Sequence, residues 1–403
     1  MGILERIKDI ELEISRTQIN KATTTHLGLL RAQLSRLRTQ LMMPKAGDGG
    51  GGHEGFAVAK SGDGRVALIG FPSVGKSSLL NEVTDTKSEA AAYEFTTLTC
   101  IPGNLVLNDT KIQLLDLPGI IEGAAAGKGR GREVIAVARS SDLIMMVLDG
   151  AREVNNQHRN ILERELETMG IRLNKTPPDI YYRKKAIGGI KFNSTVPLTK
   201  LGEKPQDAVT RLLNGYKIHH AEVLFREDAG LDELIDVIEG NRKYVRCLYV
   251  YNKIDTLSIE EVDELARKPD SVVISLYMKL NIDYMLEKMW DYMGLLRVYT
   301  KRRGQPPDLT EPVVLSNQRH GLTVESACQS VSRELLDVFN FALVWGRSTK
   351  FNPQRVGSTH VLADEDIVPK TVQQQKQSKD YASKVQAYND SIQKERRRKH
   401  KIK

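Results

Sequence analysis

The chain has 403 residues, among them 59 Lys or Arg and 51 Asp or Glu, which give it a formal net charge of +8. No apolar run approaches the ~18–20 residues of a membrane-spanning helix, and the three cysteines are scattered without metal or disulfide spacing. The composition therefore excludes an integral membrane protein and a disulfide-stapled secreted domain. It predicts a soluble, cytoplasmic protein with no membrane partner.

The first segment, residues 1–46, alternates apolar and charged residues at helical spacing. Its two apolar stripes are Ile3, Ile7, Ile10 and Ile14, and Leu27, Leu30, Leu34, Leu37 and Leu41. Because steps of three and four residues place side chains on one face of a helix, we predict a helical hairpin. Its second helix carries Arg31, Arg36 and Arg38 without any acid, so it either packs on the body of the protein or contacts RNA.

The string GFPSVGKS at residues 70–77 matches the phosphate-loop pattern G-x-x-x-x-G-K-[ST]. An apolar strand precedes it and a helix follows, so phosphates would lie on a helix N-terminus. Lys76 would reach the β- and γ-phosphates of a nucleotide, and the Ser77 hydroxyl would bind Mg²⁺. The other residues expected to contact the nucleotide here are Phe71, Pro72, Ser73, Val74, Gly75 and Ser78.

Three further positions complete the predicted phosphate and metal site. Asp116 ends a second apolar strand, where its carboxylate would hold Mg²⁺ through a water molecule. Gly119, in DLPG, lets its backbone N–H approach the γ-phosphate closely. Of the pair Thr96 and Thr97, we favour Thr97 as the magnesium ligand and keep Thr96 as the alternative. Lys76, Thr97 and Gly119 are the predicted catalytic groups.

The string NKID at residues 252–255 follows a third apolar strand and indicates which base is bound. The Asp255 carboxylate can accept two hydrogen bonds from guanine, whereas adenine would leave it buried and unpaired. Asn252 would brace the loop and contact the base, and the stem of Lys253 would cover the base. Ser275 and Leu276, after a further strand, would support the base. Together these motifs predict a guanine-nucleotide switch enzyme that uses Mg²⁺ and converts GTP to GDP and phosphate.

The residue after DLPG affects the expected rate of hydrolysis. Ras-like enzymes place a glutamine there to orient the attacking water, but this chain has Ile120, which forms no side-chain hydrogen bond. We therefore expect slow intrinsic hydrolysis, assisted by backbone groups, a monovalent cation or a partner. Ser73 stands where some potassium-activated GTPases carry asparagine, so K⁺ stays open as an activator.

The spacing of the motifs predicts the domain organisation. The fold class is α/β, with a P-loop GTPase domain of mostly parallel, doubly wound sheet at 62–169 and 244–296. Gly119 and Asn252 are 133 positions apart, about twice what the core needs, which predicts an inserted α+β module at 170–243. Short strands around one helix predict a β-grasp domain at 297–369.

The last segment, residues 370–403, contains eleven Lys or Arg against three acids. We predict a disordered tail that contacts RNA phosphates, with a solvated tail and a nuclear-import signal as alternatives.

Several longer strings resemble the developmentally regulated GTP-binding proteins, which belong to the Obg-related translation-factor GTPases. They are GFPSVGKS, YEFTTLTCIPG, QLLDLPGIIEGAAAGKGRGREVIAVAR, LYVYNKID, FNSTV, AEVLFRED and ALVWGRSTKFNPQRVG. The resemblance covers roughly residues 1–368, and MGILERI and MKLN resemble the second eukaryotic branch. It implies GTP hydrolysis, a TGS domain in the β-grasp region, ribosome association and a dedicated regulatory protein partner.

Two hypotheses follow. The leading one is a slow GTPase that acts with ribosomes in translation, is stabilised by the family regulatory protein and is otherwise monomeric. The alternative is a GTP-dependent scaffold or RNA-binding protein in which hydrolysis is incidental.

Overall fold

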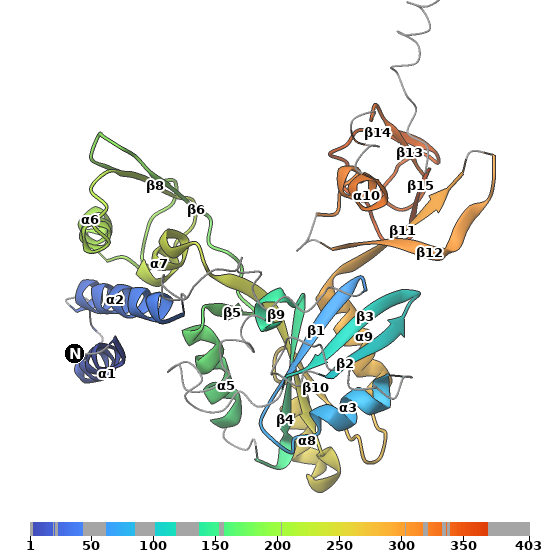
Figure 1. Cartoon of the computed structure of the whole chain (residues 1–403), viewed down its shortest axis with the longest axis horizontal. Helices are drawn as coiled ribbons and strands as arrows, with labels where there is room; N and C mark the ends of the chain where they lie inside the picture. Colours follow the sequence, from blue (N-terminus) through green and yellow to red (C-terminus); the bar gives the residue numbers. More distant parts are fainter. Residues whose placement is uncertain are drawn as a thin grey trace, which may run out of the picture. The chain divides into compact units, whose positions relative to one another are not determined.

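The computed structural model describes residues 3–18, 20, 23–42, 62–84, 101–117, 137–152, 157–202, 204–302, 304–316, 321–332, 336 and 339–369. The chain divides into two compact units, one of residues 1–61, 65–104 and 113–287, the other of residues 62–64, 105–112 and 288–403. Figure 1 labels their elements. Within the described part, no helix is both long and apolar enough to cross a membrane.

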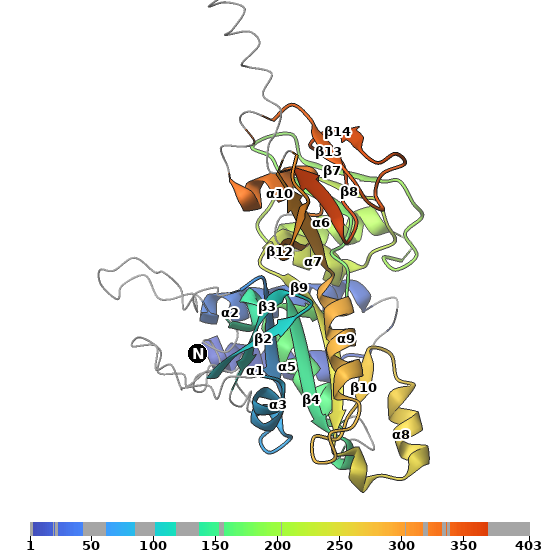
Figure 2. The ribbon, with the colours of Figure 1, turned by 90° about the vertical axis from the view of Figure 1, so that its right-hand side faces the viewer.

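A seven-stranded sheet, most of whose residues belong to the first unit, has the strand order β10-β9-β4-β1-β3-β2, with β5 paired to β9 (Figures 1 and 2). Its strands are β1 (Gly64–Ile69), β2 (Ile101–Leu107), β3 (Thr110–Asp116), β4 (Leu143–Asp149), β5 (Ile171–Leu173), β9 (Lys243–Asn252) and β10 (Ser271–Val273). Pairing is parallel between β1 and β4, β4 and β9, β9 and β10, and β5 and β9.

The strands β1 and β4 are buried at every residue, as expected for a sheet covered on both faces. The helices of this region are α3 (Lys76–Val83), α5 (Gln157–Thr168), α8 (Ile259–Ala266) and α9 (Ile282–Met293). Alternate residues of β1, β4 and β9 pack with Leu162 and Leu166 of α5 and Leu265 of α8 in one core. The predicted α/β class with a mostly parallel sheet is confirmed.

The N-terminal segment forms two helices that contact each other, α1 (Ile3–Arg16) and α2 (Thr24–Met42). Of the predicted leucine stripe, Leu27, Leu30 and Leu34 are buried and Leu37 is partly buried, while the Leu41 side chain lies outside the described set. Helix α2 packs on two helices of residues 205–239, and Arg36 Nη1 donates a hydrogen bond to the Gly215 carbonyl at 3.0 Å. Packing on the body therefore occupies part of this helix.

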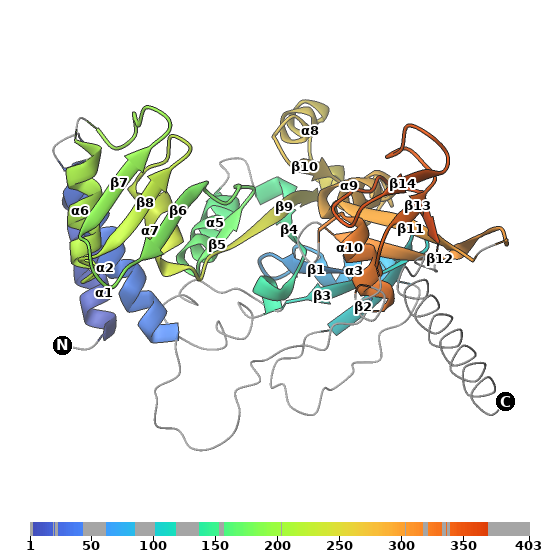
Figure 3. The ribbon, with the colours of Figure 1, turned by 90° about the horizontal axis from the view of Figure 1, so that it is seen from above.

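Along the chain, the residues between β5 and β9 form a separate small sheet and two helices with a core of their own. We call this region the inserted module. Its strands are β6 (Ile180–Lys184), β7 (Ile190–Ser194) and β8 (Ala221–Phe225), and its helices are α6 (Pro205–Gly215) and α7 (Leu231–Glu239). The strand order is β6-β8-β7 (Figure 3). Strand β8 pairs antiparallel with β6 and parallel with β7, and its alternate residues face the helices.

The second unit contains a three-stranded sheet of order β12-β11-β15 and a hairpin of β13 and β14. The bounds are β11 (Leu295–Lys301), β12 (Pro307–Ser316), α10 (Val324–Val331), β13 (Ala342–Val344), β14 (Gln354–Val356) and β15 (Asp366–Pro369). Val324 and Cys328 of α10 pack against Val298 and Val344 in a small core. Residues 295–369 thus contain short strands and the helix α10, around which part of the core is packed. The predicted tail, 370–403, lies outside the described residues.

Candidate nucleotide site

The phosphate loop connects β1 to α3, and its shape depends on two glycines. A Cβ on Gly70 would lie 2.3 Å from the Val147 carbonyl oxygen, so only glycine fits against β4 there. Gly75 has φ 102°, a conformation that L side chains rarely adopt, and a Cβ there would lie 2.5 Å from Asn252 Nδ2. The loop is thus held tightly between the sheet and the NKID segment.

Lys76 is the first residue of α3 and folds back over its own loop. Its Nζ donates to the carbonyl oxygens of Gly70 at 2.8 Å and Phe71 at 2.9 Å. Burial lowers the pKa of the Lys76 ammonium, and the neighbouring Asp116 carboxylate acts in the opposite direction. The ammonium is therefore already positioned at the loop where phosphates would bind.

Ser77 and Asp116, the two described residues predicted to bind the metal, lie in hydrogen-bond contact with each other. Ser77 Oγ donates to Asp116 Oδ2 at 2.6 Å, which joins the start of α3 to the end of β3. Asp116 is buried, and its second oxygen, Oδ1, has no hydrogen-bond partner within the described part of the chain. Since a buried carboxylate oxygen without a partner is costly, this arrangement fits a hydrated divalent cation beside the hydroxyl and carboxylate.

The residues predicted to recognise the base are held by hydrogen bonds to two other segments. Asn252 Nδ2 donates to the Val74 carbonyl at 2.9 Å, and Asn252 Oδ1 accepts from the Leu276 backbone N–H at 3.2 Å. Ser275, which is fully buried, donates from Oγ to Asp255 Oδ1 at 2.6 Å. These hydrogen bonds bring the phosphate loop, the NKID segment and the loop after β10 together.

The structure does not describe every predicted residue. Thr96, Thr97, Gly119 and Ile120 lie outside the described residues, so their placement stays a prediction. Phe71 is half-buried against the ring of His158, with centroids 4.6 Å apart. The remaining predicted residues of the loop are Pro72, Ser73 and Ser78, all of them exposed.

One neighbour of the site was missed by the sequence reasoning. Asp149, at the end of β4, accepts a hydrogen bond at Oδ2 from Lys253 Nζ at 2.7 Å. The signal was available, because Asp149 ends an apolar strand in the same way as Asp116 does.

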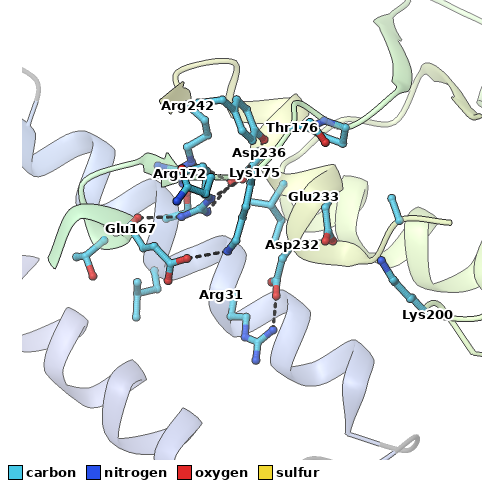
Figure 4. A pocket seen from close by; sticks show the side chains of 18 of the residues that line it. Arg31, Glu167, Arg172, Lys175, Thr176, Lys200, Asp232, Glu233, Asp236 and Arg242 are labelled. Carbon is cyan, nitrogen blue, oxygen red and sulfur yellow. Dashed lines mark hydrogen bonds and ion pairs between the residues drawn. The ribbon is translucent and has the colours of Figure 1, made fainter. Parts of the chain in front are cut away.

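A second polar region lies away from these motifs, around a cavity of about 700 Å³ lined by α2, α5, β5 and α7 (Figure 4). Here Asp236 accepts from Arg172 Nε at 2.7 Å and Nη2 at 2.8 Å, and from Arg242 Nε at 3.1 Å. At the rim of the cavity, Arg31 Nη1 lies 2.5 Å from Asp232 Oδ2. We call this set of ion pairs the ionic junction, because it joins the N-terminal helices, the central sheet and the inserted module.

Comparison with known proteins decides the family. Models of three domains match in order: "50S ribosome-binding GTPase" at residues 65–184, "C-terminal region of MMR_HSR1 domain" at 187–295 and "TGS domain" at 296–369. The chain is 62% identical over 368 residues to Developmentally-regulated G-protein 1 of Arabidopsis thaliana, covering 91% of each. It is 60% identical to Developmentally-regulated GTP-binding protein 2 of Homo sapiens, covering 91% of this chain and 99% of that one.

The chain belongs to the developmentally regulated GTP-binding protein family. As a member of this family it is a GTP-binding GTPase with a TGS domain, so the predicted family and enzyme class are confirmed. GTP is the substrate, and GTPases of this kind use Mg²⁺. Among solved structures, the match to the YchF GTPase of Schizosaccharomyces pombe has 13% sequence identity and a TM-score of 0.42, and it covers 77% of this chain and 98% of that one.

Proposed function

We propose that the family's GTP is bound and hydrolysed by the residues just described. The observation that carries this proposal is the hydrogen-bonded connection from Val74 of the phosphate loop through Asn252 to Leu276. It places the loop that would cradle phosphates beside the loop that would recognise the base. Lys76 would bind the β- and γ-phosphates, and the Asp255 carboxylate, kept in place by Ser275, would accept the two guanine N–H groups.

Magnesium would be held by the Ser77 hydroxyl and, through water, by Asp116, with Thr97 as the further ligand. When bound, the metal neutralises charge on the β- and γ-phosphate oxygens. The unpaired Asp116 Oδ1 within the described residues supports this assignment. The chain's own contribution is to hold the hydroxyl, the carboxylate and the Lys76 ammonium around one point.

Hydrolysis would be slow without help. Ile120 replaces the glutamine that orients water in Ras-like enzymes, so the attacking water must be positioned by other groups. The Gly119 backbone N–H and Thr97 would sense the γ-phosphate, and Ser73, which has φ 64°, lies at the loop position where K⁺ would act. A cation or a partner would then supply the missing orientation.

We further propose that the protein acts in the cytoplasm with ribosomes and with a regulatory protein, as a slow GTPase of translation. The family membership and the "50S ribosome-binding GTPase" description of residues 65–184 support the ribosome as the partner. The basic segment 370–403 would add RNA contact. The competing function, a GTP-dependent scaffold, is favoured by the apolar Ile120.

The test is steady-state GTP turnover of the full chain with and without purified ribosomes, in sodium and then in potassium buffer. We expect slow turnover alone and at least a tenfold increase with ribosomes, since supplying a missing catalytic group typically changes rates by 10² or more. Lys76→Ala is the control for contaminating GTPases. Turnover that stays slow everywhere, while ribosomes still bind the GTP form, would support the scaffold instead.

A further inference from the structure

Asp149 ends β4 directly beside the last residue of β9, because the register pairs Asp149 with Asn252. Its side chain is only 6% exposed. Oδ1 accepts from the Ala151 backbone N–H at 3.2 Å, and Oδ2 accepts from Lys253 Nζ at 2.7 Å. Oδ1 therefore stabilises the turn after β4, whereas Oδ2 contacts the NKID segment.

The ion pair with Asp149 restrains the side chain of Lys253. Lys253 has φ 66°, in the left-handed region, so its backbone already holds an unusual conformation at the turn after β9. Its side chain is 40% exposed, and a lysine at such a position would ordinarily sample many rotamers. A second cation, Arg152 Nε, lies 3.9 Å from the same oxygen but is far more exposed. Lys253 is thus the closer cationic partner of Asp149.

We propose that Asp149 is a positioning residue of the guanine site. It holds the Lys253 ammonium so that the lysine stem lies in place along the face of the base before the nucleotide arrives. This inference rests on the proposed assignment of the base site to Asn252, Lys253 and Asp255. Restraining a side chain in its bound conformation removes an ordering cost of binding, which corresponds to about a three- to tenfold gain in affinity.

The effect should be the same for GDP and GTP, because the base is common to both. It should appear mainly in the dissociation rate, as most affinity differences within one site do. It should also depend on the Lys253 ammonium, because within the described residues Lys253 is the NKID residue whose side chain contacts Asp149.

The experiment measures dissociation of a fluorescent N-methylanthraniloyl-GDP from the full chain by stopped flow. Asp149→Asn keeps an oxygen for the Ala151 N–H and removes the charge that faces Lys253. Lys253→Met keeps an apolar stem and removes the ammonium. We expect each single variant to release GDP about three to ten times faster than wild type, and the double variant to be no faster than the singles.

The matched control is Asp263→Asn on α8, which breaks an exposed ion pair with Arg267, the residue after the helix, and should release the nucleotide at the wild-type rate. Thermal melting confirms folding of each variant. Wild-type dissociation in Asp149→Asn, or additive effects in the double variant, would overturn the inference. If Asp149→Asn releases GDP at the wild-type rate while Asp255→Asn loses GDP binding, only the role of Asp149 is rejected. If Asp149→Asn and Asp255→Asn both bind GDP normally, the base-site assignment is rejected too.

Discussion

The proposed nucleotide site and the ionic junction are both built from buried or half-buried charges, but their hydrogen bonds are distributed differently. In the junction, Asp236 accepts from two arginines, and Tyr244 Oη lies 3.4 Å away. In the nucleotide site, Asp116 has one oxygen bonded to Ser77 and the other without a partner among the described residues. A fully satisfied carboxylate stabilises the fold, whereas a partly satisfied one is available to a ligand.

This difference predicts which substitutions change stability and which change binding. Removing a partner from the junction should leave a buried charge uncompensated and lower the free energy of unfolding. Removing a base-reading group from the nucleotide site should change affinity and selectivity with little effect on unfolding.

The largest effect is expected at the centre of the junction. Asp236→Ala leaves Arg172 and Arg242, which are 18% and 11% exposed, without their carboxylate. We expect the free energy of unfolding to fall by about 3–5 kcal/mol, measured by urea titration. Asp263→Ala on α8 is the exposed control. A loss below about 1 kcal/mol would show that the junction behaves like a surface pair and would remove the contrast.

The next effect is expected at the base. Asp255→Asn replaces an acceptor of two guanine N–H groups with an amide, while its oxygen can still accept from Ser275. We expect GDP affinity to fall by about a hundredfold, and xanthosine diphosphate to bind better than GDP. Calorimetric titration with both nucleotides measures this change. Unfolding should stay close to wild type, and unchanged GDP affinity would contradict the assignment.

The smallest effect is expected at the rim of the junction. Arg31 and Asp232 are 43% and 52% exposed, so water and salt screen their ion pair. We expect Arg31→Ala to lower the free energy of unfolding by less than about 1 kcal/mol, and the loss to shrink further in 1 M salt. Urea titrations at two salt concentrations check this. A loss as large as that of Asp236→Ala would mean that α2 is a main support of the junction.

The amino-acid sequence by itself determined the fold class, the family and the residues expected at the nucleotide site, because those signals are local. A phosphate loop needs glycines and a lysine within eight positions, and NKID needs four. Such motifs follow apolar strands, so their place at one edge of a parallel sheet could also be predicted. The roles of all these site residues remain predictions, and Thr97 and Gly119 also lie outside the described residues.

Only the tertiary structure decided which distant charges meet. Lys253 and Asp149 are 104 positions apart, and Arg172 and Asp236 are 64 apart, with no motif joining either pair. Any of the chain's 59 cations could have paired with any of its 51 acids as far as composition shows. The register of β4 with β9, and the packing of the inserted module beside β5 and β9, select these pairs. The sequence therefore shows which side chains are charged, but the alignment of the strands decides which charged side chains pair.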